Sequence, residues 1–140
     1  MNIIVSACLL GHNSKYNGGN NYSEKVARYT EGHHVIPVCP EVAGGLPTPR
    51  IPAEIVQGVV TNRAGISVDK EYRLGAKICL ETALANHADL AILQSRSPSC
   101  GVKEIYDGTF SKKRIPGKGI FAQMLADRGI PMMDLEDVPE

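Results

Sequence analysis

The chain has 140 residues, a usual length for one domain with one hydrophobic core, so we expect a single domain over residues 1–140. Hydrophobic residues make up 43% and charged residues 21% of the chain, as in globular proteins, and 15 basic side chains balance 15 acidic ones. Because no net charge attracts a polyanion or an anionic membrane surface, we expect neither a nucleic acid polymer nor a membrane as a partner.

The N-terminal stretch "MNIIVSACLLG" carries no basic leader, and its apolar run is shorter than a signal peptide or a membrane span requires. We therefore expect a cytoplasmic protein. In that reducing compartment, we expect the four cysteines to be thiols, metal ligands or catalytic groups rather than disulfides.

The first half of the chain predicts two strands with a helix between them. Residues 2–7 form an apolar run typical of a central strand, and Ser23 can cap a helix that extends to about residue 31. Residues 34–38, "HVIPV", predict the second strand. The segment 42–54, "VAGGLPTPRIPAE", holds three prolines and two glycines, so we expect an irregular loop. A loop of that length inside a compact domain is usually functional.

The middle of the chain predicts a hairpin, a helix and a strand. Residues 55–68, "IVQGVVTNRAGISV", indicate a small β-hairpin that turns between Asn62 and Gly65. Residues 69–87 are apolar at helical spacing and predict a long helix, and residues 88–95, "ADLAILQS", indicate a buried strand.

The last part of the chain repeats the alternation of helix and strand. A glycine-rich entry at residues 116–119 precedes a helix to about Arg128, Gly129 stops that helix, and residues 130–135 predict a final strand. We expect the acidic tail that follows to be a solvated end, with its carboxylates on Asp134, Glu136, Asp137 and Glu140. Together the elements predict an α/β fold with a Rossmann-like, mostly parallel sheet, helices on both faces and a small β-hairpin insertion.

Three of the cysteines lie at the end of a predicted strand or in the loop that follows one. Ligands of an open parallel sheet bind outside the carboxyl ends of its strands, because the loops that leave those ends meet over one crevice. Cys8 ends the first strand, Cys39 ends the second, and Cys100 lies in the loop after residues 88–95. We therefore expect these three thiols at one edge of the sheet. Cys79 falls in the middle of the long helix and is expected in the core, away from that edge.

The spacing of these thiols leaves several functions open. Structural zinc sites usually carry paired Cys-x-x-Cys knuckles, which this chain lacks, so zinc is the weaker interpretation. Thiolates also select soft metals and iron–sulfur clusters, and three thiolates on a four-iron cluster leave one iron open to bind another molecule. A metal-free thiol enzyme remains a further interpretation.

Six stretches spread over nearly the whole chain match the motifs of one known family. They are "VSACLLG", "KYNGG", "VCPEVAGGLPTPRIPAEI", "SRSPSCG", "IYDGTF" and "GKGIFAQMLADRGI". On these motifs the chain resembles the DUF523 family, whose characterised members include iron–sulfur-dependent 2-thiouracil desulfidases.

The resemblance implies a small α/β domain that carries a 4Fe-4S cluster on three cysteines. In that family the fourth iron takes the sulfur of a thiolated pyrimidine and removes it. Carried over by motif, the implied cluster and metal ligands are Cys8, Cys39 and Cys100. One departure is "KYNGG", which replaces the Arg-Tyr-Asp-Gly-Gly form of many relatives, so we expect Lys15 and Asn17 to influence substrate preference.

Two motif residues can carry the chemistry of replacing C=S by C=O. This reaction needs water delivered to carbon, for which Glu41, two residues from Cys39, is the candidate general base. The alternative for Glu41 is a loop carboxylate tied to Arg50 or to a backbone amide. Ser97 is the candidate for orienting substrate or water, with Ser99 as a second hydroxyl, although serines in such a turn also serve only to hold the backbone.

The remaining charged and histidine residues indicate less. Arg50, Arg96 and Lys103 can lower the pKa of the thiols and offset the charge of an anionic cluster, or simply face solvent. The glycines at residues 117–119 lack a P-loop or a full Gly-x-Gly-x-x-Gly pattern, so we expect no nucleotide cofactor. The four histidines show no metal-binding spacing and receive no function.

Two classes of function therefore compete. The favoured hypothesis is a 4Fe-4S-dependent desulfidase that acts on a thiolated nucleobase such as 2-thiouracil or on a similar small thiocarbonyl compound. The alternative is a non-catalytic module that binds a cluster or senses redox state through the same thiols.

Overall fold

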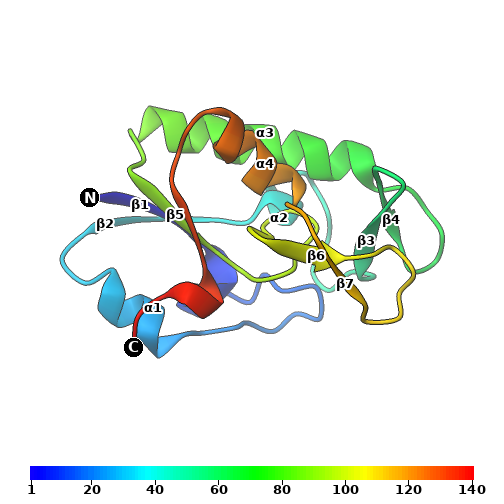
Figure 1. The fold of residues 1–140 in the computed structure, drawn as a ribbon, viewed down its shortest axis with the longest axis horizontal. Coiled ribbons are helices and arrows are strands. Elements are labelled where there is room, and N and C mark those ends of the chain that lie inside the picture. Colours follow the sequence, from blue (N-terminus) through cyan, green and yellow to red (C-terminus); the bar gives the residue numbers. More distant parts are fainter.

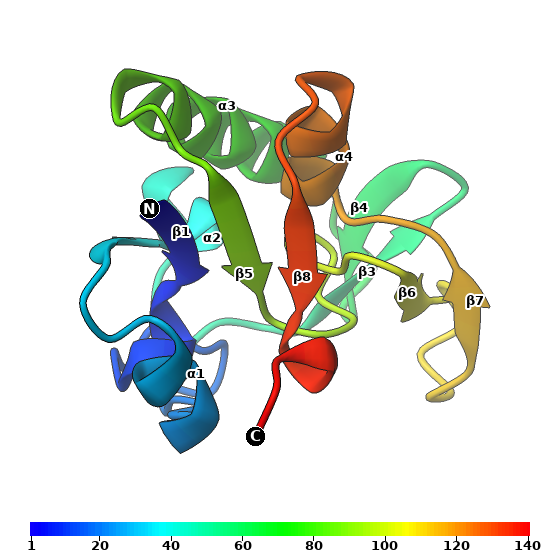
Figure 2. The same ribbon diagram turned by 60° about the vertical axis from the view of Figure 1, so that its left-hand side comes forward.

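The protein, here a computed structural model that describes residues 1–140, is built around a four-stranded parallel sheet with the strand order β2-β1-β5-β8. Figure 2 shows β1, β5 and β8 side by side with their arrows pointing in one direction. This confirms the expected Rossmann-like α/β sheet. The four strands are β1 (Asn2–Ser6), β2 (His34–Val38), β5 (Leu90–Leu93) and β8 (Met132–Asp134).

Helices cover both faces of this sheet, as expected. The long helix α3 and the shorter α4 lie on one face, and α1 lies on the other (Figure 1). None of the helices is long and apolar enough to cross a membrane. The helices are α1 (Glu24–Tyr29), α2 (Pro40–Ala43), α3 (Asp69–Ala85) and α4 (Ile120–Asp127), with 3-10 turns η1 (Ala7–Leu10) and η2 (Leu135–Asp137).

Alternate side chains of the central strands fill two separate hydrophobic clusters. On β1, Ile4 joins the cluster under α3 and α4, whereas Ile3 and Val5 join the cluster under α1. This follows from the two-residue period of a strand. Ile3, Ile4 and Val5 are each 0% exposed, and burying a side chain of this size stabilises the fold by about 1.5–3 kcal/mol.

The β-hairpin insertion is present, but its turn was predicted at the wrong place. Strands β3 (Ala53–Val56) and β4 (Val59–Asn62) pair antiparallel around Gln57 and Gly58. Both turn residues have positive φ, of 49° and 82°, as a two-residue hairpin turn requires. The expected turn at residues 62–65 exists as a second reversal, in which the Asn62 side chain accepts the backbone N–H groups of residues 64 and 66.

The strands β6 (Glu104–Tyr106) and β7 (Arg114–Pro116) were not predicted. They form a second two-stranded antiparallel sheet, which carries the segment 107–113 at its tip. Each strand has only three residues, and β7 is exposed throughout, so neither shows the apolar alternation that indicates a strand.

The acidic tail is the solvated end that its composition suggested at Glu136, Asp137 and Glu140, which are exposed, but not at Asp134. Asp134 is only 2% exposed; its carboxylate accepts hydrogen bonds from the Ser95 hydroxyl at 2.6 Å and from the Glu136 backbone N–H at 2.8 Å. Val138 is 3% exposed and packs in the cluster under α1. The tail follows β8 at the carboxyl edge of the sheet, so these contacts anchor it beside the loops of that edge.

Two glycines let α2 cross α3 at close range. A Cβ atom on Gly75 would collide with the Pro40 carbonyl, and a Cβ atom on Gly44 would collide with the Glu71 carbonyl. Glycine is required at both positions because the two backbones touch. The crossing also sets the position of the residues at the start of α2, among them Cys39 and Glu41.

We predict that Gly75→Ala lowers the free energy of unfolding by about 3 kcal/mol, because the added methyl group meets backbone that cannot rotate away. Without the collision, replacing glycine by alanine would stabilise the helix by about 1 kcal/mol, so a loss of stability indicates the collision. Urea unfolding measures the change. Lys77→Ala, on the exposed side of the same helix, is the control and should stay within about 0.5 kcal/mol of the unsubstituted protein. A Gly75→Ala protein as stable as this control would contradict the crossing.

Candidate active site

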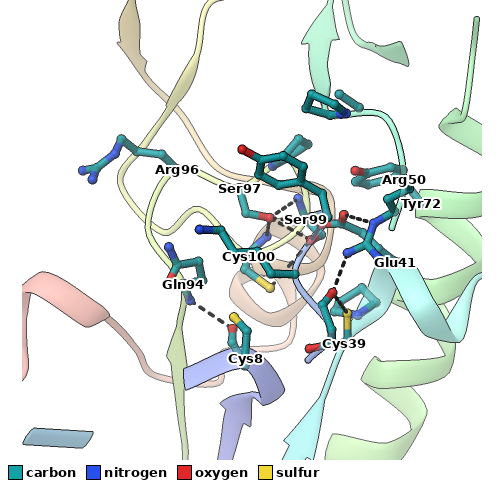
Figure 3. Close-up of a pocket in the computed structure, with 18 of the residues that line it drawn as sticks. Cys8, Cys39, Glu41, Arg50, Tyr72, Gln94, Arg96, Ser97, Ser99 and Cys100 are labelled. Carbon is teal, nitrogen blue, oxygen red and sulfur yellow. Dashed lines mark hydrogen bonds and ion pairs between the residues drawn. The ribbon is translucent and has the colours of Figure 1, made fainter. Parts of the chain in front are cut away.

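Three cysteines meet in one cavity at the carboxyl edge of the sheet. Cys8 lies in η1 directly after β1, Cys39 caps α2 directly after β2, and Cys100 lies in the loop after β5. All three line a cavity of about 420 Å³ (Figure 3). The structure thus brings together the three thiols that their positions after the strands had singled out.

The fourth cysteine is separate from this cavity. Cys79 lies on α3, is 3% exposed and packs in the hydrophobic cluster under α3 and α4. It does not line the cavity. All four cysteines are free thiols. Burial raises the pKa of the Cys79 thiol to about 12, with a smaller contribution from the charge of Cys39, so Cys79 stays protonated at neutral pH.

The expected lowering of the thiol pKa by nearby cations is wrong for two of the three cavity cysteines. Burial raises the pKa of Cys8 and of Cys100 above the ordinary value for a thiol. Two of the three cations are engaged elsewhere: Arg96 pairs with Glu136 at 3.1 Å, and Lys103 pairs with Asp137 at 3.2 Å. The acidic tail therefore neutralises the charges that were expected to act on the thiols.

Glu41 lies at the centre of a hydrogen-bond network inside the cavity. One carboxylate oxygen accepts from Arg50 Nε at 3.0 Å, and the other accepts from the Ser99 hydroxyl at 2.9 Å. The side chains of Glu41 and Arg50 are 13% and 6% exposed, so water screens their pairing little. Tyr72 on α3 lies near Glu41, and burial of its hydroxyl, together with the charge of that carboxylate, raises the pKa of Tyr72. Glu41 is thus tied to Arg50 and also faces the cavity.

The loop at residues 97–101 is held by its own serines. The Ser97 hydroxyl oxygen accepts the backbone N–H groups of Ser99 and Cys100, each at 3.1 Å, and lies 2.9 Å from the Ser99 hydroxyl. Ser97 is also 3.4 Å from Glu41 Oε2, a longer contact than that of Ser99. Ser97 therefore shapes the turn that presents Cys100 and reaches the carboxylate as well.

The glycine-rich entry to α4 serves this loop rather than an anion. The Pro98 carbonyl accepts the N–H of Ile120 at 2.8 Å, and the Ser99 carbonyl accepts the N–H of Phe121 at 2.9 Å. A Cβ atom on Gly119 would lie only 2.6 Å from the Ser99 carbonyl oxygen. The first N–H groups of the helix are thus occupied by the loop that carries Cys100, in keeping with the absence of a phosphate-binding motif.

Aromatic and basic side chains also line the cavity. The segment 107–113 contributes Phe110, and the buried Glu54 holds this segment by accepting the N–H groups of Gly108 at 3.0 Å and Phe110 at 3.1 Å. Arg63 lies over the Phe110 ring, 5.8 Å from its centroid. The other lining residues of these two kinds are Lys15, Tyr16, Arg50, Tyr72, Arg96, Tyr106 and Lys112.

The two departures in "KYNGG" fall in different surroundings. Lys15 lines the cavity. Asn17 does not; its side chain accepts the Gly19 backbone N–H at 2.9 Å and so holds the turn. Of the two residues, only Lys15 is therefore placed to contact a molecule bound in the cavity.

Sequence reasoning missed several polar residues of the cavity. Ser6 is the last residue of β1, and Gln94 follows β5, so their positions at strand ends were a usable signal. Tyr72 could not be found in this way, because the crossing of α2 over α3 brings it near Glu41. Ser14 and Asn21 were also missed; they come from the loop between η1 and α1.

The cavity has polar groups that the protein itself leaves without partners. Three buried side-chain atoms in the chain have no hydrogen-bond partner, and two of them, Ser14 Oγ and Gln94 Oε1, belong to residues that line this cavity. Buried polar atoms are rarely left unpaired, so these atoms can bind water or a polar guest in the cavity. No three Cys, His, Asp or Glu side chains are arranged so that they could hold a single metal ion. Three thiols in one cavity form a donor set that suits an iron–sulfur cluster.

Comparison with known proteins identifies the family. The sequence pattern of the family described as "2-thiouracil desulfurase" matches residues 3–137. The chain belongs to this family. It is 39% identical over 137 residues to the uncharacterized protein YbbK of Bacillus subtilis (strain 168), a match that covers 91% of each chain.

A solved structure of the desulfurase family has the same fold. It is a [4Fe-4S]-dependent thiouracil desulfidase, TudS, with a TM-score of 0.92 and 38% sequence identity, and the match covers 99% of this chain and 93% of that one. The resemblance to DUF523 that the motifs carry is thereby confirmed.

We predict that Cys79 in the folded, metal-free protein reacts with iodoacetamide far more slowly than Cys8 or Cys39 at pH 8. Only the thiolate attacks this reagent, and a pKa of about 12 leaves Cys79 almost entirely protonated. Mass spectrometry of alkylated peptides measures the rates. All four cysteines should react at similar rates in denaturant, and fast alkylation of Cys79 in the folded protein would contradict its burial.

Proposed function

We propose that the protein is an iron–sulfur-dependent desulfidase that removes sulfur from a thiolated nucleobase such as 2-thiouracil, or from a similar small thiocarbonyl compound, by converting C=S to C=O. The observation that carries this proposal is the cavity where three strand ends deliver Cys8, Cys39 and Cys100 beside Glu41. Membership of the 2-thiouracil desulfurase family and the likeness to TudS support it.

The cluster, in this proposal, is a 4Fe-4S group bound by Cys8, Cys39 and Cys100. When bound, it supplies a thiophilic iron that polarises the C=S bond as a Lewis acid. The protein's part is to present three sulfur ligands and to leave one side of the cavity open to substrate. The cavity of about 420 Å³ lies within the range of small-molecule sites, and the cluster and the substrate share it, which favours a small substrate.

Glu41 is the general base of the proposal. Its Oε2 receives the proton of the water that adds to the thiocarbonyl carbon, while Arg50 fixes Oε1 at 3.0 Å and keeps the carboxylate in place. The hydroxyls of Ser97 and Ser99 lie 3.4 Å and 2.9 Å from Oε2 and orient the water or the substrate there. The proton then passes to the departing sulfur, so that the net reaction consumes one water and releases sulfide.

We further propose that residues 1–140 act as one unit in the cytoplasm, on a small thiolated substrate rather than on a nucleic acid polymer or at a membrane. Four free thiols and a cluster-binding role suit a reducing compartment. The chain's lack of net charge is in keeping with a small-molecule substrate.

Anaerobic reconstitution with iron and sulfide tests the proposal as a whole. The expected result is about four irons per chain, broad visible absorption, and sulfide release from 2-thiouracil with uracil as the product. Cluster uptake without sulfide release from a panel of thiolated pyrimidines would favour the non-catalytic cluster-binding or redox-sensing alternative. A protein that takes up no iron would overturn both.

The cysteines should separate into two groups when each is changed to serine. We predict that Cys8→Ser, Cys39→Ser and Cys100→Ser each lose most of the bound iron and all detectable sulfide release, because a serine hydroxyl is a poor ligand for a soft metal. Cys79→Ser should keep iron and activity, at a stability cost of about 1–3 kcal/mol for a buried hydroxyl. Iron analysis and thermal unfolding of all four variants test this prediction. Loss of iron from Cys79→Ser alone would refute the assignment of the ligands.

Glu41→Gln should keep the cluster and lose turnover. The amide preserves the shape of the side chain but cannot accept a proton, so we predict a decrease in kcat of about 10²–10⁴-fold with unchanged iron content. Steady-state sulfide release and iron counting measure both. Glu81→Gln, on the exposed side of α3, is the matched control and should leave kcat unchanged. A Glu41→Gln enzyme with normal kcat would exclude Glu41 as the base.

A further inference from the structure

The loop between η1 and α1 is fastened to the residue that carries the first thiol. The backbone N–H of Asn21 donates to the Cys8 carbonyl at 2.9 Å, and the loop is closed on itself by bonds between Lys15 and Gly19 and between Gly18 and Lys15. The backbone of Asn21 is therefore held beside Cys8 independently of its side chain.

The side chain of Asn21 points to the sulfur of the same cysteine. Its amide nitrogen Nδ2 lies 3.8 Å from Cys8 Sγ in a partly buried position, within range of an N–H···S hydrogen bond. Asn21 also lines the cavity. Its amide N–H is therefore placed to donate to the Cys8 sulfur as an outer-shell partner.

The three cavity thiols differ in what faces them. The sulfur of Cys100 lies 3.7 Å from the Ser99 hydroxyl, whereas the Cys39 thiol faces an acceptor, the Ser14 carbonyl, at 3.9 Å. For Cys8 the facing side-chain donor is Asn21. Hydrogen bonds to the sulfurs of an iron–sulfur cluster offset its negative charge and help to set its reduction potential.

We propose that Asn21 is a positioning residue that donates its side-chain amide N–H to the Cys8 thiolate and holds this sulfur as a cluster ligand. The assignment rests on the proposed cluster-binding function. It gives a role to a residue to which the sequence motifs assign none, and the role depends on the donor rather than on the shape of the side chain.

Replacing Asn21 by aspartate removes the hydrogen-bond donor but keeps the shape of the side chain. Asn21→Asp is nearly isosteric, keeps the backbone bond to Cys8, removes the N–H donor and places a negative charge beside a thiolate. Asn21→Ala removes the donor without adding charge. The control is Asn20→Asp, which adds the same charge one residue away and keeps the oxygen that accepts the Tyr22 N–H at 3.0 Å.

The measurements are made on anaerobically reconstituted protein and do not depend on turnover. We expect Asn21→Asp to lose visible cluster absorption to an iron chelator about 10-fold to 100-fold faster than Asn20→Asp, the range seen when a hydrogen bond to a metal ligand is removed. Asn21→Ala should show a smaller acceleration and a lower midpoint potential of the cluster, because an N–H that offsets its charge is gone. Thermal unfolding of the metal-free proteins should be alike for all three variants.

Each outcome bears on the assignment. If the unsubstituted protein takes up iron and both Asn21 variants keep the cluster as long as Asn20→Asp does, at an unchanged potential, Asn21 is not a positioning residue and the proposed function stands. If the unsubstituted protein takes up no iron, the proposed function and this assignment fall together. If the metal-free Asn21 variants unfold well below the control, the contact is structural, and the assignment is wrong.

Discussion

The common carboxyl edge of β1, β2 and β5 is the constraint on which the rest of the molecule depends. Parallel strands that are packed side by side must release their chains at one edge, so residues far apart in the sequence arrive over the same crevice. Cys8, Cys39 and Cys100 lie in the segments that leave those strands. Below them, the side chains of β1 and β5 alternate between two hydrophobic clusters, and this buried core gives the segments a rigid base.

Above that base, the cavity is organised around one buried ion pair. Bringing Glu41 and Arg50 out of water is costly, and the pair is retained because serine hydroxyls satisfy the carboxylate while backbone carbonyls satisfy the guanidinium. The network joins α2, the segment that carries Arg50 and the loop at residues 97–101. The carboxylate proposed as the base is thereby fixed in a cavity that also holds three thiols.

The parts of the fold that could be predicted are those with a strong local pattern. The strands of the central sheet, the helix at residues 69–85 and the cysteines after strand ends follow from periodicity and topology. The hairpin turn was misplaced because Asn62 and Gly65 are stronger turn residues than Gln57 and Gly58, and only the backbone angles distinguish the two sites.

What could not be predicted depends on contacts between distant parts of the chain. Asp134 looks like any acidic residue of a solvated tail until Ser95 is placed beside it by the pairing of β5 with β8. The same holds for Arg96 and Lys103, whose charges the tail neutralises, and for Tyr72, which reaches Glu41 only through the crossing of two helices. The composition of the chain and the spacing of its residues do not reveal contacts of this kind.

The supply of the three thiols from three separate strands also has a consequence for biosynthesis. The donor set exists only after β1 has paired with both β2 and β5, and such non-local parallel pairings form late and slowly in folding. A nascent or unfolded chain therefore offers isolated thiols in place of a site. In the proposed enzyme, insertion of the cluster therefore follows the closure of the sheet, and the folded apoprotein carries three uncoordinated thiols until then.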